Sequence, residues 1–233
     1  HRADPGGPRA RRRDGVRHGG GRRRAGGGPG GGPEAGGGGA AGVNAARMAT
    51  GLAADVTILE VDAERMRFLD ITVQEAHTLY STEANILSLL PRLDLIIGAV
   101  LIPGAAAPKL VTRDMLKQMA PGSVFVDIAI DQGGCSETSR PTTHDQPTYV
   151  EEGVLHYCVT NMPGAYSRTA TQALNNVTHR WTFMLAERGL REACGERPEL
   201  LSGINCTGGK LTCLPVGEAH GLPVSNPAEV LEL

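Results

Sequence analysis

The sequence predicts an α/β protein built on a doubly wound parallel sheet and followed by C-terminal helices. Short apolar runs alternate with helical stretches along the middle of the chain. A glycine-rich turn precedes the first of these helices, and acidic residues or glycines follow several of the apolar runs. Strands separated by helices pair in parallel, because each helix returns the chain to the same end of the sheet.

The first 42 residues differ sharply in composition from the remainder of the chain. They hold 17 of the 32 glycines and nine arginines against three acidic residues, whereas the rest is net negative. Such a segment buries too little apolar surface to offset the entropy lost on ordering. RNA binding through the arginines is disfavoured, because the segment has no aromatic side chain to stack on bases. We therefore expect residues 1–36 to be a low-complexity segment that is disordered or misread.

Several classes of protein are disfavoured by the composition. No apolar run approaches the roughly 18 residues of a membrane span, and no signal-peptide core follows the N-terminus, so a soluble cytoplasmic protein is expected. The five cysteines are an odd number without C-x-x-C spacing, which predicts reduced thiols. The seven histidines are scattered without metal-ligand pairing, so no metal site is expected.

A glycine-rich turn stands before the first expected helix. Gly37, Gly39 and Gly42 have the spacing G-x-G-x-x-G, which serves a tight turn, close approach to a pyrophosphate and close helix packing. The apolar run 56–59 follows and ends at Glu60, which is placed to accept hydrogen bonds from ribose hydroxyls, with the acid two residues further on as the alternative. Glycines alone are weak evidence in so glycine-rich a tract. Together with the helix, strand and acid they indicate a dinucleotide site.

Further strands and helices alternate along the chain. Apolar strands are expected at residues 77–80, 94–100 and 154–159, with helices at 83–90 and 112–119. In a sheet of this kind the loops after the strands converge on one crevice, where ligands bind. Nucleotide is therefore expected across the carboxyl edge of the sheet.

The most informative run is PGSVFVDIAIDQGG, in which an apolar strand over residues 124–130 ends at Asp131. Burial of this strand would deliver a carboxylate and two glycines, Gly133 and Gly134, to the ligand-binding edge. Glycines allow a ligand to approach the backbone closely, and Asp131 offers an acceptor or a proton-transfer group. Lys109 is expected to be a solvated surface lysine without a role.

Helices are expected to complete the chain. Residues 168–188 carry apolar side chains at helical spacing, which predicts a helix packed into a core. These side chains are Ala173, Val177, Trp181, Met184 and Leu185. A last helix is expected to begin at Asn226 and Pro227, where asparagine caps and proline occupies the first turn. The expected division is a nucleotide-binding domain over residues 37–165 and a helical part over residues 166–233.

Three long runs of this chain resemble one known family in order and spacing. They are GAVLIPGAAAPKLVTRDMLKQMAPGSVFVDIAIDQGG, ETSRPTTHDQPTYVEEGVLHYCV and NMPGAYSRTATQALNN. All three are similar to the nucleotide domain of alanine dehydrogenase, which shares a superfamily with pyridine nucleotide transhydrogenase. The resemblance covers about residues 37–232 and is most specific over residues 98–165. The sequences of the IDQGG and RPTTHD loops resemble the alanine dehydrogenase branch more than the transhydrogenase branch.

The resemblance implies roles for particular residues. Asp131 would be catalytic, near the nicotinamide and the substrate. The glycine loop would hold the pyrophosphate of NAD, and Glu60, where the family usually has aspartate, would hold the adenosine ribose. The full set implied to bind NAD is Gly37, Gly39, Gly42, Glu60, Ser81, Val100, Leu101, Asn161 and Met162.

The N-terminal substrate domain of the family is not recognisable in this chain. In the family that domain supplies the Arg and Lys that grip the carboxylate of pyruvate and the His that exchanges a proton, and residues 1–35 do not resemble it. GGPGGGPEA stands where an apolar first strand is needed, although its prolines cannot donate to a sheet and its glycines weaken a strand. We therefore expect residues 1–36 to be read in a wrong frame or to come from a damaged gene end, and the sheet to lack its first strand. A similar irregularity lies at residues 71–77.

The function implied is that of a fragment of alanine dehydrogenase, an enzyme of L-alanine catabolism that interconverts L-alanine with pyruvate and ammonia and moves hydride to or from NAD. The resemblance also implies a homohexamer for the complete protein, with small-molecule partners and neither nucleic acid nor membrane. Two alternatives stay open, a non-catalytic NAD-binding module and a relative of the transhydrogenase alpha subunit. The fragment alone is expected to be inactive.

Overall fold

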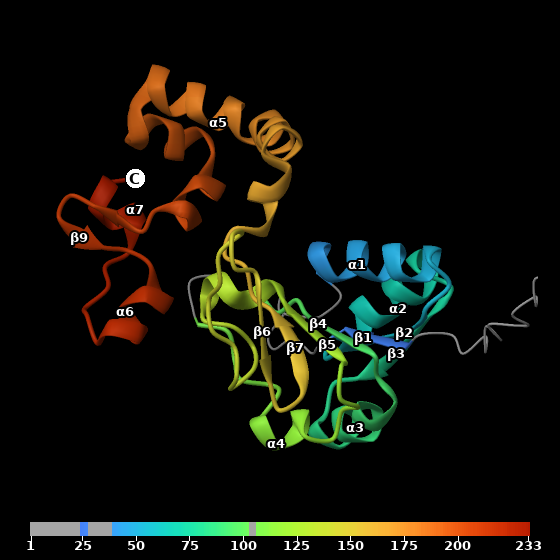
Figure 1. Cartoon of the computed structure of the whole chain (residues 1–233). Helices are drawn as coiled ribbons and strands as arrows, with labels where there is room; N and C mark the ends of the chain where they lie inside the picture. The colour runs from blue at the N-terminus through green and yellow to red at the C-terminus, as the bar shows by residue number, and fades with distance from the viewer. Residues whose placement is uncertain (1–23, 28–38, 103–105) are drawn as a thin grey trace, which may run out of the picture.

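The computed structural model describes residues 24–27, 39–102 and 106–233, which form a central sheet with helices on both faces and a C-terminal helical part (Figure 1). The strands are β1 Arg24–Gly27, β2 Asp55–Glu60, β3 Ala76–Tyr80, β4 Leu95–Gly98, β5 Val124–Asp127, β6 Thr148–Glu151 and β7 Val154–Tyr157. Their order in the sheet is β3-β2-β1-β4-β5-β7-β6. Every neighbouring pair is parallel except β6 and β7. The predicted doubly wound parallel sheet is confirmed, with β6 as an antiparallel edge strand that the sequence did not reveal.

The helices follow the predicted order along the chain. They are α1 Ala40–Gly51, α2 Ala63–Thr72, α3 Glu83–Leu89, α4 Arg113–Leu116, α5 Ser167–Glu196, α6 Leu214–His220 and α7 Pro227–Leu231. Short 3-10 helices are η1 Leu90–Arg92, η2 Ile128–Gln132, η3 Met162–Tyr166 and η4 Pro198–Gly203, and a small hairpin joins β8 Cys206–Thr207 to β9 Lys210–Leu211. Side-chain caps fix several helix starts, because the first backbone N–H groups of a helix need acceptors. Thr82 caps α3, and Asn226 caps α7 as predicted.

Two apolar clusters cover the two faces of the sheet. Val56 and Ile58 of β2 pack with side chains of α1 and α2, whereas Leu59 belongs to the cluster on the side of α3 and α4. Successive side chains of a strand point to opposite faces, so this split shows that β2 is covered on both sides. Fully buried Phe125 of β5 belongs to the second cluster.

Strand β5 is shorter than predicted. The sequence indicated a strand to Ile130, but β5 ends at Asp127 and the next five residues form η2, which carries Asp131. The helical turn closes where the Gly133 and Gly134 N–H groups donate to the carbonyls of Ile130 and Ala129. Both glycines have positive φ, which turns the chain back toward the sheet. The buried residues of this turn gave it the appearance of a longer strand.

Strand β1 lies within residues 1–36, the segment that was predicted to contribute no strand to the sheet. Its residues pair in parallel with β2 on one side and β4 on the other. The expectation of a missing strand is therefore wrong, because sheet pairing requires only backbone groups and Arg24–Gly27 contains no proline. Most of GGPGGGPEA, together with Gly37, lies outside the described residues, so a misread origin for the segment stays a prediction.

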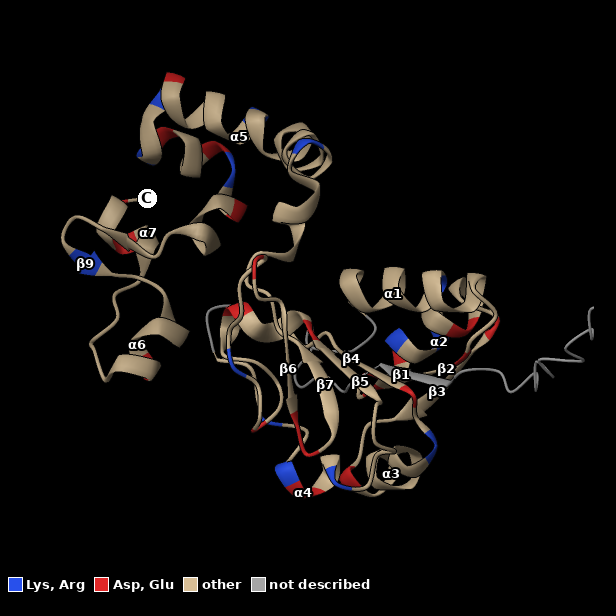
Figure 2. Ribbon diagram, in the orientation of Figure 1, with Lys and Arg blue, Asp and Glu red and all other residues tan. Residues whose placement is uncertain are grey.

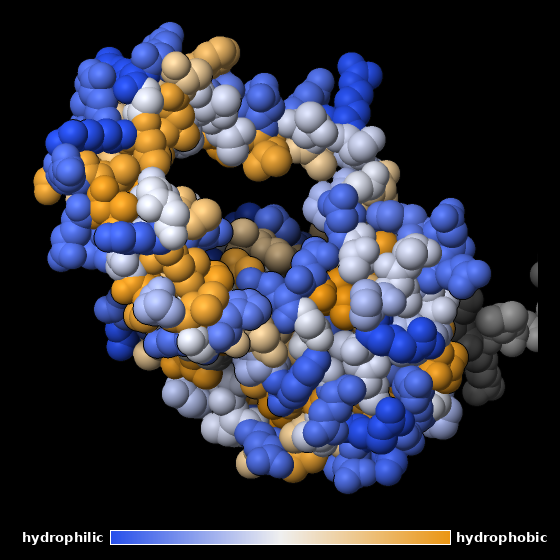
Figure 3. All heavy atoms as spheres, turned by 90° about the vertical axis from the view of Figure 1, so that its left-hand side faces the viewer, coloured by the Kyte–Doolittle hydropathy of each residue, from blue (hydrophilic) through white to orange (hydrophobic). Residues whose placement is uncertain are grey.

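Helix α5 is longer than predicted and is not packed into a core within this chain. Leu174, Val177 and Phe183 are each at least 60% exposed, and only Ala193 and Cys194 of this helix are buried. Gly189, with φ 74° and ψ 168°, interrupts the helical backbone. Figure 3 shows apolar residues exposed on the C-terminal part of the molecule. The prediction of the helix is confirmed, and the prediction that its apolar positions are packed into a core is wrong.

Basic residues occur along α5, whereas its acidic residues Glu187, Glu192 and Glu196 lie in the last third of the helix (Figure 2). Within residues 24–27, 39–102 and 106–233, no helix combines the length and the apolar character needed to cross a bilayer.

The glycines of β1 should make the centre of the sheet weaker than it could be. Each glycine in a strand interior costs about 0.5–1 kcal/mol relative to alanine, and valine is enriched in strands. We expect the double substitution Gly26→Val and Gly27→Val to raise the free energy of unfolding in urea by about 1–2 kcal/mol and to tighten NAD binding. Gly203→Val, at an exposed site with open space around it, is the control. A destabilised double variant would contradict the importance of β1.

Candidate functional site

The carboxyl edge of the sheet gathers most of the residues predicted to form a site. Because the strands are parallel, the segments that follow them leave at one edge of the sheet (Figure 1). Glu60 ends β2, Ser81 follows β3, and Val100 and Leu101 follow β4. Asp131 follows β5, and Asn161 with Met162 follows β7. The predicted site residues thus share one edge although they span a hundred positions of the chain.

The N-terminus of α1 is suited to binding an anion. Its cap residue, Gly39, has an extended conformation and no side chain that could cap the helix. No acidic residue stands in the first turn. Gly42 is buried in the first turn, which allows close helix packing. The N–H groups of a helix N-terminus and the helix dipole favour phosphate at such a position. Gly37, the first glycine of the motif, lies outside the described residues.

Glu60 is buried at the end of β2, with 1% of its surface exposed. Its Oε1 accepts hydrogen bonds from the N–H groups of Val61 at 2.7 Å and Asp62 at 3.2 Å. The Ser81 N–H donates to the Glu60 carbonyl at 2.9 Å, which joins two residues predicted to bind the same cofactor. Asp62, the alternative acid, caps α2 through the N–H groups of its first turn. Both acids therefore accept hydrogen bonds from the backbone, and the role of Glu60 at a ribose stays a prediction.

The segment after β4 lies against the turn that carries Asp131. Val100 is buried, whereas Leu101 is exposed. Gln132 Nε2 donates to the Ile102 carbonyl at 3.1 Å, and the Ala107 N–H donates to the Gln132 carbonyl at 2.9 Å. Among the described residues, Gln132 Oε1 is a buried side-chain oxygen without a hydrogen-bond partner. A buried acceptor of this kind is free for a donor from a ligand or a water.

Asp131 and Asn161 meet although they are 30 positions apart in the chain. The Asn161 N–H donates to Asp131 Oδ1 at 3.1 Å. Asn161 has φ 53° and ψ 53°, a left-handed conformation that asparagine tolerates better than most residues. On the other side, His144 Nε2 lies 3.3 Å from the Asn161 carbonyl. The structure therefore adds His144 to the site, a residue that the scattered histidines of the sequence did not single out.

Asp127 is the main residue of this region that the sequence analysis missed. It is fully buried, and its Oδ2 accepts hydrogen bonds from the Cys135 N–H at 2.9 Å and from the Ser139 hydroxyl. Cys135 Sγ lies 3.6 Å from Oδ1. Burial, and then the charge of Asp127, raises the pKa of the Cys135 thiol well above its usual range, so the thiol stays protonated. The signal available in the sequence was a carboxylate inside an apolar strand.

Lys109 has a structural role that the sequence analysis denied it. Its Nζ donates to the carbonyls of Gly133 at 2.6 Å and Gly134 at 2.9 Å. The ammonium group thus holds the glycine turn that follows Asp131. Lys109 is exposed, as predicted, but the expectation that it has no role is wrong, because a partner 24 positions away cannot be inferred from local sequence.

His156 forms a buried polar layer next to the site. Its Nδ1 lies 2.9 Å from the Val154 carbonyl and therefore carries the proton, so Nε2 accepts from the Thr138 hydroxyl at 2.8 Å. The ring stacks on Tyr149 with centroids 4.9 Å apart. Burial lowers the pKa of His156, which keeps the ring neutral in the folded protein. Burial also raises the pKa of Tyr149, whose hydroxyl donates to the Thr138 carbonyl.

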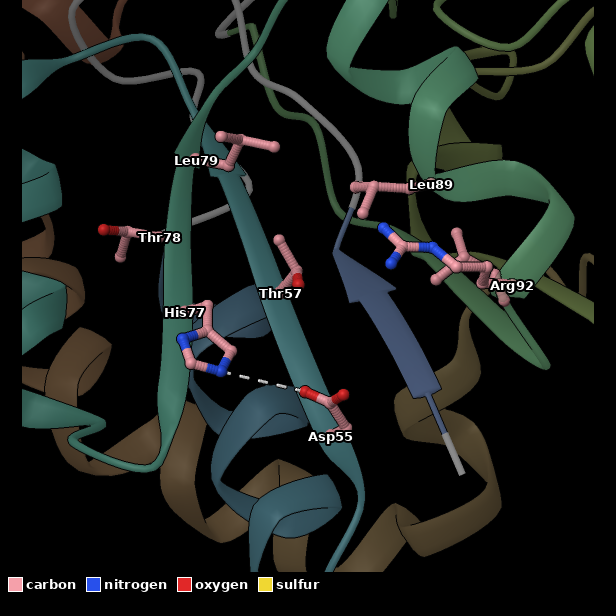
Figure 4. A pocket seen from close by; sticks show the side chains of 8 residues that line it. Asp55, Thr57, His77, Thr78, Leu79, Leu89 and Arg92 are labelled. Atoms are coloured by element: carbon pink, nitrogen blue, oxygen red, sulfur yellow. Dashed lines mark ion pairs between the residues drawn. The ribbon is translucent and has the colours of Figure 1, made fainter. Parts of the chain in front are cut away.

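A cavity of about 240 Å³ lies on the sheet at β2 and β3 (Figure 4). His77 Nε2 lies 3.9 Å from Asp55 Oδ1 at this cavity. The residues that line it are Asp55, Thr57, His77, Thr78, Leu79, Leu89, Arg92 and Leu93. Asp55 is the first residue of β2, so the cavity begins at the amino end of that strand. Leu79 lies near the carboxyl end of β3, so the cavity extends along the strands.

The fold and the edge geometry define a class of protein. A doubly wound parallel sheet, a glycine-capped helix after the first strand and an acid at the end of the next strand are typical of dinucleotide-binding domains. The family model described as "Alanine dehydrogenase/PNT, C-terminal domain" matches residues 35–214. The chain belongs to this alanine dehydrogenase/PNT family, as its sequence motifs predicted.

Known relatives agree with this assignment. Alanine dehydrogenase of Halomonas elongata is 53% identical over 191 residues, which are 82% of this chain and 52% of the relative. Alanine dehydrogenase 2 of Staphylococcus aureus is 51% identical over 195 residues, which are 83% of this chain and 52% of the relative. The chain thus spans about half the length of the curated relatives that it matches.

Solved structures match in the same way. An L-alanine dehydrogenase superposes with a TM-score of 0.72 at 42% identity, covering 86% of this chain and 53% of that protein. The transhydrogenase from Sinorhizobium meliloti gives a TM-score of 0.56 at 29% identity, covering 70% and 45%. The predicted α/β fold and the family resemblance are both confirmed.

The buried neutral state of His156 predicts a pH-dependent stability. Below the unfolded-state pKa of about 6.5, His156 binds a proton in the unfolded chain but stays neutral in the folded chain until the pH reaches its lowered pKa. The free energy of unfolding therefore decreases as the pH is lowered through this range. We expect His156→Gln to flatten this fall between about pH 7 and pH 5 in urea titrations. His179→Gln, at an exposed histidine, should leave the slope unchanged. Equal slopes in all three proteins would contradict the assignment.

Proposed function

We propose that this chain is the NAD-binding and C-terminal helical part of an alanine dehydrogenase, which converts L-alanine reversibly into pyruvate and ammonia. The observation that carries the proposal is the contact of Asp131 with Asn161 at the carboxyl edge of a sheet that belongs to this family. The names of the relatives and their 51–53% identity support the same reaction. The substrates would be small molecules, with no role for nucleic acid or a membrane.

The described residues of the edge fit a dinucleotide. The uncapped N-terminus of α1, with Gly39 and Gly42, suits the pyrophosphate. Glu60 and Ser81 would face the adenosine ribose. Val100, Leu101, Asn161 and Met162 would lie along the nicotinamide half. When bound, NAD accepts a hydride from the α-carbon of L-alanine, which is thereby oxidised by two electrons.

Asp131 would orient the reacting amine. Its carboxylate is exposed, and the Asn161 N–H holds Oδ1, which leaves Oδ2 for the substrate amine or the departing ammonia. Oxidation of L-alanine gives an imine, which takes up one water to release pyruvate and ammonia. The proton lost in this sequence would pass to a base outside the present chain. Asp131 therefore positions the nitrogen rather than completing the catalytic set.

The arrangement of the complete protein is part of the proposal. Residues 37–165 would form the NAD-binding domain and residues 166–233 the C-terminal portion of the substrate domain. The exposed apolar side chains of α5, such as Val177 and Phe183, support a partner surface supplied by the rest of that domain or by another subunit. A homohexamer in the cytoplasm that serves L-alanine catabolism is the assembly we infer for the complete enzyme.

Two other functions retain specific support. A non-catalytic NAD-binding module is consistent with a chain that spans about half the length of its relatives. A relative of the transhydrogenase alpha subunit is consistent with the match to the Sinorhizobium meliloti structure. The higher identity and TM-score of the alanine dehydrogenase matches favour the amino-acid dehydrogenase.

Catalysis should require the portion of the family that this chain does not match. We expect the isolated chain to show no L-alanine-dependent reduction of NAD at 340 nm, whereas a fusion to the N-terminal half of the Halomonas elongata relative should be active. In that fusion, Asp131→Asn should lower kcat/KM by about a hundredfold or more, because the oriented carboxylate is lost. Asp114→Asn, at an exposed carboxylate, is the control. Robust alanine oxidation by the isolated chain would contradict the incomplete catalytic set.

Glu60 should set the preference for NAD over NADP. Its negative charge would stand where the additional phosphate of NADP lies, so NAD should bind at least about tenfold more tightly, which corresponds to about 1.4 kcal/mol. Glu60→Gln should reduce this ratio in isothermal titrations, and Glu64→Gln, at an exposed acid of the next helix, should not. Equal or tighter binding of NADP by the unmodified chain would refute the role of Glu60.

A further inference from the structure

We propose that Asp127 is a positioning residue, which holds the turn that carries Asp131 in the geometry needed for catalysis. The inference rests on the proposed function of Asp131. Asp127 is the last residue of β5 and is buried, whereas Asp131 lies in η2 and is exposed. The two acidic residues of VDIAID therefore have different tasks.

The carboxylate of Asp127 closes the turn from inside. The chain leaves the sheet after Asp127 and returns at Cys135, whose N–H donates to Asp127 Oδ2 at 2.9 Å. The Ser139 hydroxyl donates to the same oxygen. Asp127 is 0% exposed, so water does not compete for these bonds. One side chain therefore ties the first and last residues of the turn together, with Asp131 between them.

The space around the Asp127 carboxylate leaves no room for a side chain at Gly98 or Gly134. A Cβ at Gly134 would lie 2.8 Å from Asp127 Oδ2 and 2.5 Å from Ser139 Cβ. A Cβ at Gly98 of the neighbouring strand would lie 2.3 Å from Cys135 Sγ. The backbone can return this close to Asp127 because glycine stands at both positions.

A second set of contacts fixes the same turn from outside. Lys109 Nζ donates to the carbonyls of Gly133 and Gly134, and the Ala107 N–H donates to the Gln132 carbonyl. The Asp127 carboxylate therefore holds the turn from the sheet, and the Lys109 ammonium group holds it from the preceding segment. Asp131 remains exposed, with its Oδ1 directed to the Asn161 N–H.

Removal of the Asp127 carboxylate would leave buried donors without an acceptor. An unsatisfied buried N–H or hydroxyl is strongly unfavourable, and the turn would avoid this cost by opening toward water. Opening would displace Asp131 and break its contact with Asn161, and displacement of a reacting group by about 1 Å is enough to lower a rate severely. Asparagine at position 127 keeps one oxygen that can accept both hydrogen bonds.

The test compares Asp127→Ala with Asp127→Asn in the chain as it stands. Hydrogen–deuterium exchange of residues 128–135 and of the Asn161 amide reports the turn, and NADH fluorescence reports cofactor binding. We expect about tenfold faster exchange and about tenfold weaker NADH binding in Asp127→Ala, and values within about threefold of the unmodified chain in Asp127→Asn. Leu69→Ala removes a fully buried side chain from the other face of the sheet. It should lower Tm without opening the turn.

Each outcome decides between positioning and a general structural role. Unchanged exchange in Asp127→Ala, or equal opening of the turn in Leu69→Ala, would overturn the inference. If Asp127→Ala does not fold, Ser139→Ala decides, because it removes one donor and should still speed exchange of residues 128–135 about threefold. Failure of the unmodified chain to bind NADH would count against the proposed function alone, since the exchange measurements do not depend on the cofactor.

Discussion

Parallel pairing of the strands is the constraint on which the rest of this structure depends. It brings the ends of β2, β3, β4, β5 and β7 to a single edge and places residues from Glu60 to Met162 in one region. Strand β1 joins the two halves of the sheet, because it pairs with β2 on one side and β4 on the other. A strand rich in glycine can occupy this central position because the pairing uses backbone groups alone.

The edge combines a hydrogen-bonded turn with exposed polar side chains. The Asp127 carboxylate accepts a hydrogen bond from the Cys135 N–H after the turn that follows β5. The Lys109 ammonium group donates to the Gly133 carbonyl in the same turn. Asp131 and His144 remain exposed and meet at Asn161. A site of this kind keeps its chemical groups accessible while the hydrogen bonds of the supporting residues limit their movement.

The C-terminal helices leave several large apolar side chains exposed. Helix α5 has the apolar spacing of a packed helix, yet Leu174, Val177 and Phe183 are exposed. Trp181 instead contacts the guanidinium groups of Arg180 and Arg197. An exposed apolar surface at this position supports the partner surface proposed for α5.

The sequence by itself determined the alternation of most strands and helices and the family, because apolar periodicity, caps and motifs are local properties. It did not reveal β6, and it predicted wrongly that the sheet lacks β1. It predicted Asp131 at the carboxyl edge and the cap at Asn226. Only the tertiary structure decided that β5 ends at Asp127, that Lys109 holds the glycine turn and that the apolar residues of α5 stay exposed. The contacts of Lys109 join residues 24 or more positions apart, and the burial of α5 depends on what packs against it. Such relations arise only when distant segments meet, and no local pattern encodes them.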